Sequence, residues 1–565
     1  MLLESLTRSA ATSGAGTERG CIRQRVHWRL DLDANGSPVG PVSRLGDGLN
    51  GVELEVPGEK RTSGSRAFLL DRADYTLGTP VKDDGSDKER ASLRHLLWAE
   101  LVDQARRSVG DPALAALSAL AESPQSVRLP EGFNPAQFLA VYVLGKLPTD
   151  NPELREWWRQ RIAAATKAPG AVVGQCSVCG EVREIPELLP VAVRGLSRLG
   201  GSATMALVSA NQDAFEHFGL SRARAARVCS SCGEATHQRL NALVASEQHR
   251  RFHDDVAIVW WASQDAPDLM TALFEGIRPE DVAHLLSGPW RGRPGAIGDI
   301  GRFDAVALGA SKARVVVRSW VSETLAELAD NLGAWFADAA IVERASGEHK
   351  VPGIRLLSDS LRPPGGASAG PGAPSALFTC ALQGLPLPDP IAQTALRRIG
   401  PLGQTTYPRA SLLRCWLIRR NVPMTEVLDE GNADPAYRAG RLLALLGTAA
   451  EAATGTSLTE RFYAQFSAHP GLVVGRLVEL HQHHLAKLRR DRPAQAGRLQ
   501  REIEATLEGV QDFPLHLDLQ GRARFALGLY HQQAADRARR AAYAASHPGT
   551  IQPEHEAFEP EEEQA

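Results

Sequence analysis

The first third of the chain carries the alternating hydrophobic pattern of β-strands. In residues 26–32 every second side chain is apolar, which predicts a strand with one buried face. Asn35-Gly36 follows, a pair typical of a type I′ hairpin turn. Residues 52–56 and 138–144 predict further strands.

Helical spacing appears between these strands, in residues 91–107. Four leucines recur there at intervals of three and four and are expected on one packed face: Leu93, Leu96, Leu97 and Leu101.

The pattern changes again in the second half of the chain. Residues 256–261 and 314–321 predict strands, and residues 361–376, mostly Pro, Gly, Ala and Ser, predict a mobile linker. Helical periodicity dominates afterwards. The last stretch, 551–565, contains six Glu and no Lys or Arg, which predicts a disordered acidic tail.

Composition narrows the class of protein. The 565 residues are 43% hydrophobic, with 63 Lys and Arg against 66 Asp and Glu and a formal net charge of -3. This length predicts three or four domains. The charge excludes a bulk polycation, but a local basic surface can still bind nucleic acid. Because neither a membrane span nor a signal peptide is visible, we expect a cytoplasmic protein without membrane contact.

Four of the seven cysteines form two Cys-x-x-Cys-Gly motifs, Cys176 with Cys179 and Cys229 with Cys232. Four thiolates complete a tetrahedron around Zn²⁺ without an open position, so the motifs predict a structural zinc site. The long stretch between them must fold as an insertion. The alternative is four unrelated buried or redox cysteines. The other three cysteines are isolated and are interpreted as core residues: Cys21, Cys380 and Cys415.

These patterns together predict an α+β protein. A strand-rich N-terminal region with a zinc-ribbon-like insertion precedes an all-α C-terminal helical bundle. The predicted divisions are 1–170 (strand-rich N-terminal domain), 171–236 (zinc knuckles with insertion), 237–360 (α+β continuation), 361–376 (linker), 377–550 (helical bundle) and 551–565 (acidic tail).

Histidines are densest at His481, His483 and His484. His481 and His484 share a helix face and could hold a metal, but no carboxylate completes the set, and the surrounding leucines favour core or interface histidines. No phosphate-binding loop, zinc-protease motif or nucleophile elbow occurs, so we expect no enzyme. Acidic pairs such as Asp254-Asp255 are interpreted as turns or strand entries.

Residues 390–425 contain six arginines and no acidic residue, with Tyr407 and Trp416 among them. Positive charge and aromatic faces together suit single-stranded nucleic acid. An ordinary helix with a solvated basic face is the equally weighted alternative. The six are Arg397, Arg398, Arg409, Arg414, Arg419 and Arg420.

A second basic motif is Lys60-Arg61-Thr62-Ser63-Gly64, within residues 57–64, which predict an exposed loop. Two cations, two hydroxyls and a permissive glycine could contact a DNA backbone or groove edge.

The order of motifs resembles the large subunit of the type I-C CRISPR effector complex (Cascade) over nearly the whole chain. The resemblance is carried by residues 60–64, 68–71, 75–78, 174–176, 207–211, 213–216, 259–262, 308–311, 314–320, 437–442, 483–488 and 525–532.

The resemblance implies a non-catalytic subunit of an RNA-guided antiviral complex. Such a subunit is expected to recognise the protospacer-adjacent motif, help open target double-stranded DNA, hold the displaced single strand and recruit a helicase-nuclease. Its partners would be a guide RNA ribonucleoprotein with repeated backbone subunits and a guide-processing subunit. By this resemblance, residues 60–64 would make the motif contacts, and the arginines of 397–420 would support the non-target strand.

The family is also thought to produce a separate small subunit from the same gene by internal initiation. Met424 lies just before the helical segment that opens at Asp434-Pro435 and is the candidate start. Two other readings stay open: a zinc-ribbon nuclease that uses residues 481–484, and a helical scaffold without nucleic-acid contact.

Overall fold

The computed structural model describes residues 1–12, 21–46, 51–61, 64–165, 172–189, 191–208, 210, 213–216, 218–262, 267–277, 301–366, 372–400 and 403–546. Contacts divide the chain into two compact units. Unit 1 comprises residues 1–195 and 202–242, and unit 2 comprises residues 196–201 and 243–565. The predicted tail, 551–565, lies outside the described residues.

Unit 1 contains short strands and a few helices. Its strands are β1 (Cys21–Val26), β2 (Trp28–Leu32), β3 (Ser43–Arg44), β4 (Val52–Arg61), β5 (Gly64–Ala67), β6 (Asp71–Arg72), β7 (Phe138–Val143), β8 (Val173–Gln175) and β9 (Val182–Glu184). Its helices are α1 (Leu2–Thr12), α2 (Ala73–Thr76), α3 (Gly85–Ser108), α4 (Pro112–Glu122), α5 (Pro152–Ala165) and α6 (Ser230–Ala245), with short 3₁₀ turns between them.

Two small sheets organise residues 21–143. One has the antiparallel order β1-β4-β5, and the other has the order β3-β2-β7-β6, in which β2 and β7 run parallel. The core between strands and helices is aromatic: Trp28, Trp98 and Trp158 are buried, and the Phe68 ring stacks on Trp158 with centroids 4.8 Å apart. Aromatic burial of this kind supplies much of the stability of a small core.

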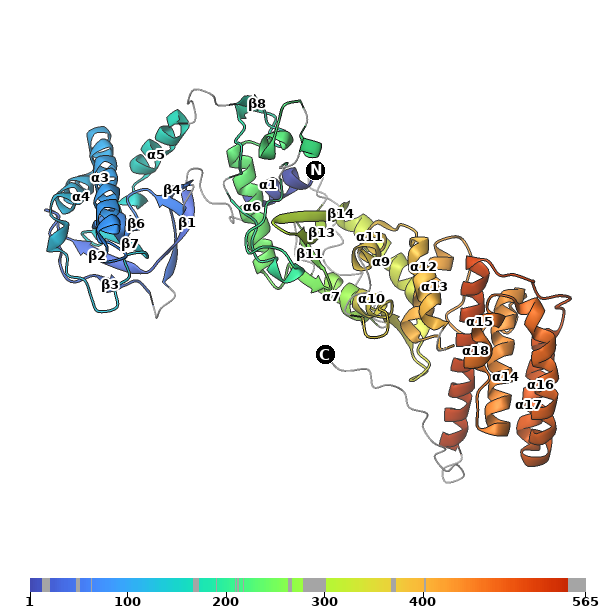
Figure 1. Ribbon diagram of the computed structural model, residues 1–565. Coiled ribbons are helices and arrows are strands. Elements are labelled where there is room, and N and C mark those ends of the chain that lie inside the picture. Colours follow the sequence, from blue (N-terminus) through green and yellow to red (C-terminus); the bar gives the residue numbers. More distant parts are fainter. Residues whose placement is uncertain are drawn as a thin grey trace, which may run out of the picture. The chain divides into compact units, whose positions relative to one another are not determined.

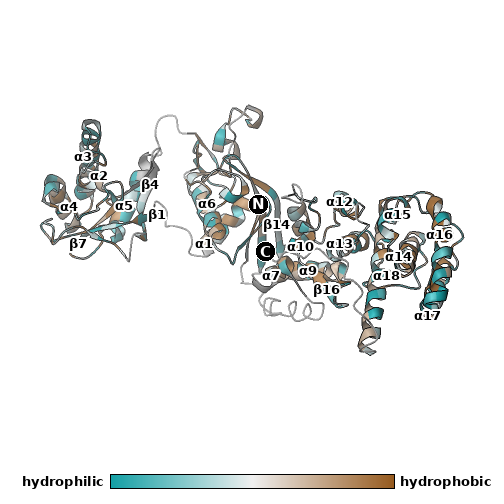
Figure 2. Ribbon diagram, turned by 60° about the horizontal axis from the view of Figure 1, so that its bottom comes forward, coloured by the Kyte–Doolittle hydropathy of each residue, from teal (hydrophilic) through white to brown (hydrophobic). Residues whose placement is uncertain are grey.

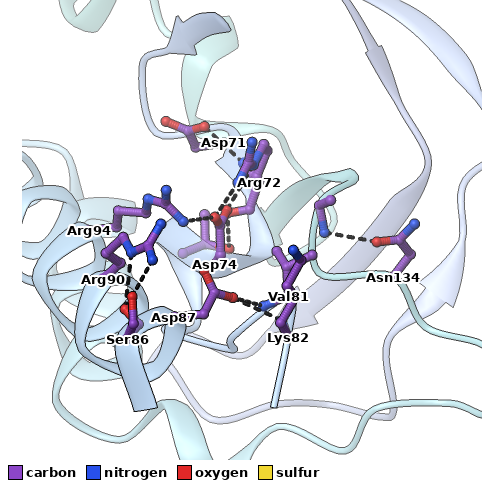
Figure 3. A network of polar contacts seen from close by, with 12 residues as sticks. Asp71, Arg72, Asp74, Val81, Lys82, Ser86, Asp87, Arg90, Arg94 and Asn134 are labelled. Atoms are coloured by element: carbon purple, nitrogen blue, oxygen red, sulfur yellow. Dashed lines mark hydrogen bonds and ion pairs between the residues drawn. The ribbon is translucent and has the colours of Figure 1, made fainter. Parts of the chain in front are cut away.

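A buried ion-pair network fixes the short helix α2 against α3 (Figure 3). The Asp74 carboxylate is fully buried and accepts hydrogen bonds from Arg72 Nε at 2.9 Å and Arg94 at 2.7 Å. Asp87 accepts the backbone N–H groups of Val81 and Lys82, both at 2.8 Å. Because a buried carboxylate is tolerated only when paired, these contacts specify the local geometry.

The strand predictions of unit 1 are confirmed, with a break at His27 that divides residues 26–32 between β1 and β2. The turn at Asn35-Gly36 is present, but only Gly36 has a positive φ, +84°, so the turn is not type I′. A Cβ on Gly36 would lie 2.4 Å from the Ala116 carbonyl oxygen. Close approach of α4 therefore requires glycine there.

The predicted packed face of α3 is wrong for three of its four leucines. Leu93, Leu96 and Leu97 are 59%, 65% and 44% exposed, whereas Trp98 and Leu101 are buried. Helical spacing alone cannot say which of two apolar stripes meets the core.

Unit 2 joins a sheet to a long series of helices. Its strands are β10 (Arg250–His253), β11 (Val256–Ala262), β12 (Gly276–Ile277), β13 (Arg302–Ser311), β14 (Arg314–Thr324), β15 (Ile341–Val342) and β16 (His349–Pro352). Its helices are η3 (Ser197–Leu199), α7 (Pro267–Glu275), α9 (Leu325–Ala339), α10 (Ile354–Asp359), α11 (Ala373–Gln383), α12 (Asp389–Ile399), α13 (Tyr407–Ile418), α14 (Pro435–Thr454), α15 (Thr459–Phe466), α16 (Pro470–Asp491), α17 (Pro493–Leu507) and α18 (Leu519–Ser546).

The main sheet of unit 2 is antiparallel, in the order β10-β11-β13-β14. Strands β11 and β14 confirm the predicted strands, and residues 373–546 confirm the predicted helical C-terminal part. The α+β fold class is therefore confirmed. None of the helices in the described ranges is long and apolar enough to cross a membrane.

Helix α14 is the centre of the C-terminal bundle and packs against α15, α16, α17 and α18 (Figure 1). Fifteen of its 20 residues are buried, and hydrophobic residues line it in Figure 2. A Cβ on Gly440 would lie 1.9 Å from the Phe525 carbonyl oxygen, and one on Gly528 would lie 2.1 Å from that of Tyr437. The backbones of α14 and α18 therefore cross in contact, which only glycine permits.

The predicted linker does not divide unit 2. Leu361 is buried, Arg362 pairs with Asp254 and Asp359, and helix α11 begins at Ala373. One hydrophobic core runs from the sheet through α9 and α11 into the bundle. Apolar faces of the flanking helices thus override the linker-like composition, while residues 367–371 lie outside the described part of the chain.

Candidate functional site

The first Cys-x-x-Cys motif forms a tight knuckle between β8 and β9. The Gly180 N–H donates to the Cys176 carbonyl at 2.9 Å, and Gly180 has a φ of +75°. The Cys176 N–H donates to the Glu181 carbonyl at 2.8 Å, which closes the two-stranded ribbon behind the turn. The glycine after Cys179 is thus needed for the turn that brings both sulfurs to one side.

The second motif reaches the knuckle at the start of α6. Cys229 precedes the helix and Cys232 lies in its first turn. The Ser177 N–H donates to the Arg227 carbonyl at 2.9 Å, and the Cys229 N–H donates to the Cys176 sulfur at 3.4 Å. These contacts hold two segments together that are far apart in the sequence.

All four ligand atoms lie within 4.8 Å of one another. Zinc–thiolate bonds of about 2.3 Å place tetrahedral sulfurs about 3.8 Å apart, so the cluster is close to the required geometry. Cys176, Cys229 and Cys232 are buried and Cys179 is exposed. The four cysteines cluster as the motifs predict, and the cluster could hold a metal ion, compatible with zinc.

Electrostatics in the cluster favour a bound cation. Burial raises the pKa of Cys176, but backbone N–H groups of Cys229, Cys179 and Val178 donate to its sulfur and lower the pKa to about 6 overall. Burial and the neighbouring Cys229 thiol raise the pKa of Cys232. Without a metal, the Cys176 thiolate thus forms readily, whereas burial opposes ionisation of the Cys232 thiol.

The six arginines of residues 390–425 do not form one exposed basic surface. Arg414 is only 6% exposed, and its guanidinium donates to the carbonyls of Met424, Thr425, Ala337 and Asp338 at 2.8 to 3.1 Å. It therefore joins α13 to the end of α9 and to the chain after α13. Burial lowers the pKa of Arg414, because desolvation disfavours the charged guanidinium.

Arg419 is likewise an internal residue. It pairs with Asp338 at 2.9 Å, and its side chain is 6% exposed. It also donates to the carbonyls of Cys380 and Leu385 at 2.8 and 2.7 Å. Arg420 pairs with Asp389 and lies 4.3 Å over the Trp416 ring.

The other arginines of this stretch are divided between backbone contacts and solvent. Arg398 donates to the Leu361 carbonyl at 3.2 Å and Arg409 to the Ser360 carbonyl at 2.9 Å, whereas Arg397 is exposed. Trp416 is only 1% exposed and offers no face for a base. The predicted combination of exposed arginines with stacking aromatics is therefore wrong for Arg414, Arg419 and Trp416.

The motif at residues 60–64 lies at a hairpin instead of a loop. Lys60 and Arg61 end β4, and Arg61 pairs with Gly64 of β5. Thr62 and Ser63 lie outside the described residues. Strand β4 continues through Pro57, which lies opposite Cys21 of β1.

The histidine group on α16 agrees with the core interpretation for His481. Its side chain is 2% exposed, and neither ring nitrogen has a hydrogen-bond partner. Burial lowers the pKa of His481 to about 4. The three isolated cysteines are buried, as expected, and Asp254-Asp255 forms the turn between β10 and β11.

Two groups were not predicted from the sequence. His253, Asp254 and Asp359 place ligand atoms within 4.8 Å of one another, but Arg362 pairs with both carboxylates. The second is a cleft of about 730 Å³ beside β10, lined by basic and aromatic residues. In residues 249–253, two arginines and a phenylalanine lie between two histidines. This mixture of basic and aromatic residues was the sequence signal that could have indicated the cleft.

A family model described as CRISPR-associated protein (Cas_Csd1) matches residues 3–536. The chain belongs to the Cas_Csd1 family. A search of curated proteins found no match. The family match covers the cysteine cluster, the β4–β5 hairpin and all helices of the bundle except the end of α18. The match to this family of CRISPR-associated proteins therefore spans nearly the whole chain.

Proposed function

We propose that this protein is the large, non-catalytic subunit of a type I-C CRISPR effector complex, located in the cytoplasm. The observation that carries the proposal is the Cas_Csd1 match over residues 3–536. In such a complex, guide RNA reads the target by base pairing, and protein reads the short adjacent motif. The partners would be the guide RNA with repeated backbone subunits and a guide-processing subunit, target DNA and a helicase-nuclease.

The β4–β5 hairpin is the candidate for reading the adjacent motif. Lys60 and Arg61 are the last residues of β4, and Arg61 lies opposite Gly64 of β5. A two-stranded ribbon fits the DNA major groove, where lysine and arginine donate to guanine edges or phosphates. This placement supports unit 1 as the part that recognises duplex DNA.

Zinc has a structural role in this proposal. Four cysteines fill a tetrahedron, so no position remains for a substrate. The site would join the knuckle to α6, and α6 contacts α1 through Thr236 and Thr7 hydroxyls 3.0 Å apart. Metal binding would thus stabilise the segments that flank residues 185–228.

The rival function is a metal-dependent nuclease. Such a centre needs ligands that remain free for a cation. His481 is buried in the bundle, and the carboxylates near His253 are already paired with Arg362. Both observations favour the non-catalytic subunit.

The test is target binding by the reconstituted complex with guide RNA, across duplexes with a library of flanking sequences. The charge reversal Lys60→Glu with Arg61→Glu should lower duplex affinity about 10-fold or more and flatten the preference among flanks, since each specific contact contributes about 1–3 kcal/mol. Arg25→Glu, exposed on β1 of the same sheet, is the control and should keep the preference.

Two results would contradict the proposal at different points. Failure of the wild-type complex to bind any duplex would reject the DNA-binding subunit. Normal binding with an unchanged preference in the double variant would reject only the role of the hairpin. Guide-independent cleavage of DNA with added divalent metal, lost in His484→Ala, would support the nuclease instead.

A small subunit from the same gene is part of the proposal. Translation from Met424 would produce residues 424–565, which include helices α14 to α18 and therefore the whole bundle around α14. Met424→Leu keeps the side-chain volume and should remove this polypeptide from the purified complex, as measured by mass spectrometry. A small polypeptide with another first residue, or none in the wild type, would reject Met424 as the start.

A further inference from the structure

A cleft beside strand β10 in unit 2 gathers unpaired positive charge around aromatic rings. Its volume is about 730 Å³, within the range of about 300–1,000 Å³ that is usual for ligand sites. β10 is an edge strand of the main sheet, and alternation places Arg250 and Phe252 on one face and Arg251 on the other. The cleft therefore surrounds the sheet edge, and Arg198 of η3 completes its wall.

Three guanidinium groups and Glu247 line the cleft, and no ion pair joins these arginines to a carboxylate among the described residues. Arg250 donates to the Val244 carbonyl at 2.5 Å, and Arg251 donates to the Glu247 carbonyl at 2.6 Å. These bonds orient the two groups and use only a few of their five N–H donors. Arg198 is exposed and lies over the Phe252 ring at 4.4 Å. Donors thus remain for an anion.

The aromatic rings give the cleft a second kind of affinity. Phe252 is partly exposed, and the guanidinium groups of Arg198 and Arg250 lie 4.4 and 5.1 Å from its ring centroid. Trp260 is 5% exposed, and the Arg251 guanidinium lies 5.7 Å from its ring centroid. The guanidinium planes of these arginines and the partly exposed Phe252 ring offer stacking surfaces for a planar base.

We propose that this cleft binds one or two nucleotides of the displaced DNA strand, with phosphates held by Arg198, Arg250 and Arg251 and a base against Phe252. The proposal rests on the function proposed above and assigns a site to it. Phosphate contacts and stacking accept any base. Such contacts suit the displaced strand, whose sequence changes with every target and whose bases have lost their pairing partners.

The experiment uses the complete complex with guide RNA and a matched duplex. Permanganate reactivity of displaced-strand thymines measures their protection, and titrations at several salt concentrations measure affinity. Arg198→Glu should lower duplex affinity about 10-fold, raise thymine reactivity and reduce the magnitude of the salt slope by about 0.7 for one lost phosphate contact on a single strand. Binding to the target strand alone should not change, because that substrate has no displaced strand.

Two variants separate charge from stacking and from general electrostatics. Phe252→Leu should raise thymine reactivity while the salt slope stays as in the wild type, because no cation is lost. Arg476→Glu carries the same charge change on an exposed residue of α16 and should behave as the wild type in protection near the cleft. Arg198→Gln repeats the test without a new negative charge, in case reversal disturbs folding.

The possible failures are distinguishable. Wild-type protection that persists in Arg198→Glu and Phe252→Leu would overturn the site and leave the DNA-binding subunit standing. A loss of guide RNA from the Arg198→Glu complex, measured by its nucleic-acid content, would assign the cleft to guide RNA and overturn the assignment to the displaced strand. A wild-type complex without duplex binding would reject the proposed function and this site with it.

Discussion

Two regions of the chain contain many groups that can bind a ligand: the cysteine cluster of unit 1 and the arginines of α12 and α13 in unit 2. They differ in the direction in which these groups point. The four thiols converge on one point, and their ligand atoms lie within 4.8 Å of one another. The arginines diverge: Arg414 and Arg419 extend into the interior, and Arg397 extends into solvent.

The difference lies in what satisfies the groups. Arg414 has backbone carbonyls as acceptors, so its charge is already compensated within the chain. Among the buried thiols, the Cys176 sulfur accepts backbone N–H groups, but burial raises the pKa of Cys232. Polar groups that converge on one point and have few hydrogen-bond partners within the chain indicate a ligand site. Polar groups whose partners lie inside the chain indicate a structural role. The cleft at Arg198, Arg250 and Arg251 follows the first pattern.

The largest expected effect is loss of metal. Cys176→Ser should reduce bound zinc from one equivalent to less than about half, because the site loses a buried ligand. Structural zinc binding contributes about 10–16 kcal/mol in small domains, so the segments around the knuckle and α6 should become sensitive to proteolysis. Elemental analysis and limited proteolysis measure both effects.

Cys380→Ser is the matched control for this comparison. Cys380 is buried outside the cluster, and its sulfur contacts the Pro386 carbonyl at 3.4 Å, a contact that serine can keep. Its zinc content should equal that of the wild type. Full zinc in Cys176→Ser as well would show that the four cysteines are not a metal site.

A smaller effect is expected from the arginines. Arg414→Met should lower the free energy of unfolding by about 3 kcal/mol, since several buried carbonyls lose a charged donor. Arg397→Met, on the exposed side of α12, should change it by less than about 0.5 kcal/mol. Chemical denaturation measures both. Equal stability of the two variants would break the distinction between internal and exposed arginines.

The smallest expected effect concerns His481, whose pKa is lowered to about 4 by burial. The folded state binds this proton less readily than the unfolded chain, so stability is present above about pH 6.5 and is lost as pH falls toward 4. Between pH 7 and pH 5 the wild type should lose about 2 kcal/mol more stability than His481→Leu. His483→Leu, exposed on the same helix, should follow the wild type. An identical pH profile in His481→Leu would show that His481 does not contribute.

Several features of this protein could be predicted because they depend on neighbouring residues. A Cys-x-x-Cys-Gly motif builds its own turn, since Gly180 supplies the positive φ wherever the knuckle is placed. Strand β11 is apolar throughout, and its residues could hardly be placed outside a sheet core. The same is true of the leucine-rich helices of the bundle.

Other features depend on partners that are distant in the sequence. Whether α3 packs through Trp98 or through Leu96 is decided by the helices that it contacts, α2, α4 and α5. The composition of residues 361–376 indicates a linker, but Arg362 meets Asp254 more than 100 positions earlier. Such pairings leave no local signal.

The sequence by itself determined the α+β class, the two thiol motifs and the helical C-terminal part, because spacing, turn chemistry and hydrophobic periodicity are local properties. Only the tertiary structure decided which charges remain available. A guanidinium group has a structural role when backbone carbonyls accept its hydrogen bonds, as at Arg414. It can bind a ligand when its N–H donors remain available, as at Arg198. Residue type is the same in both cases, and the surroundings that distinguish them exist only after the chain has folded.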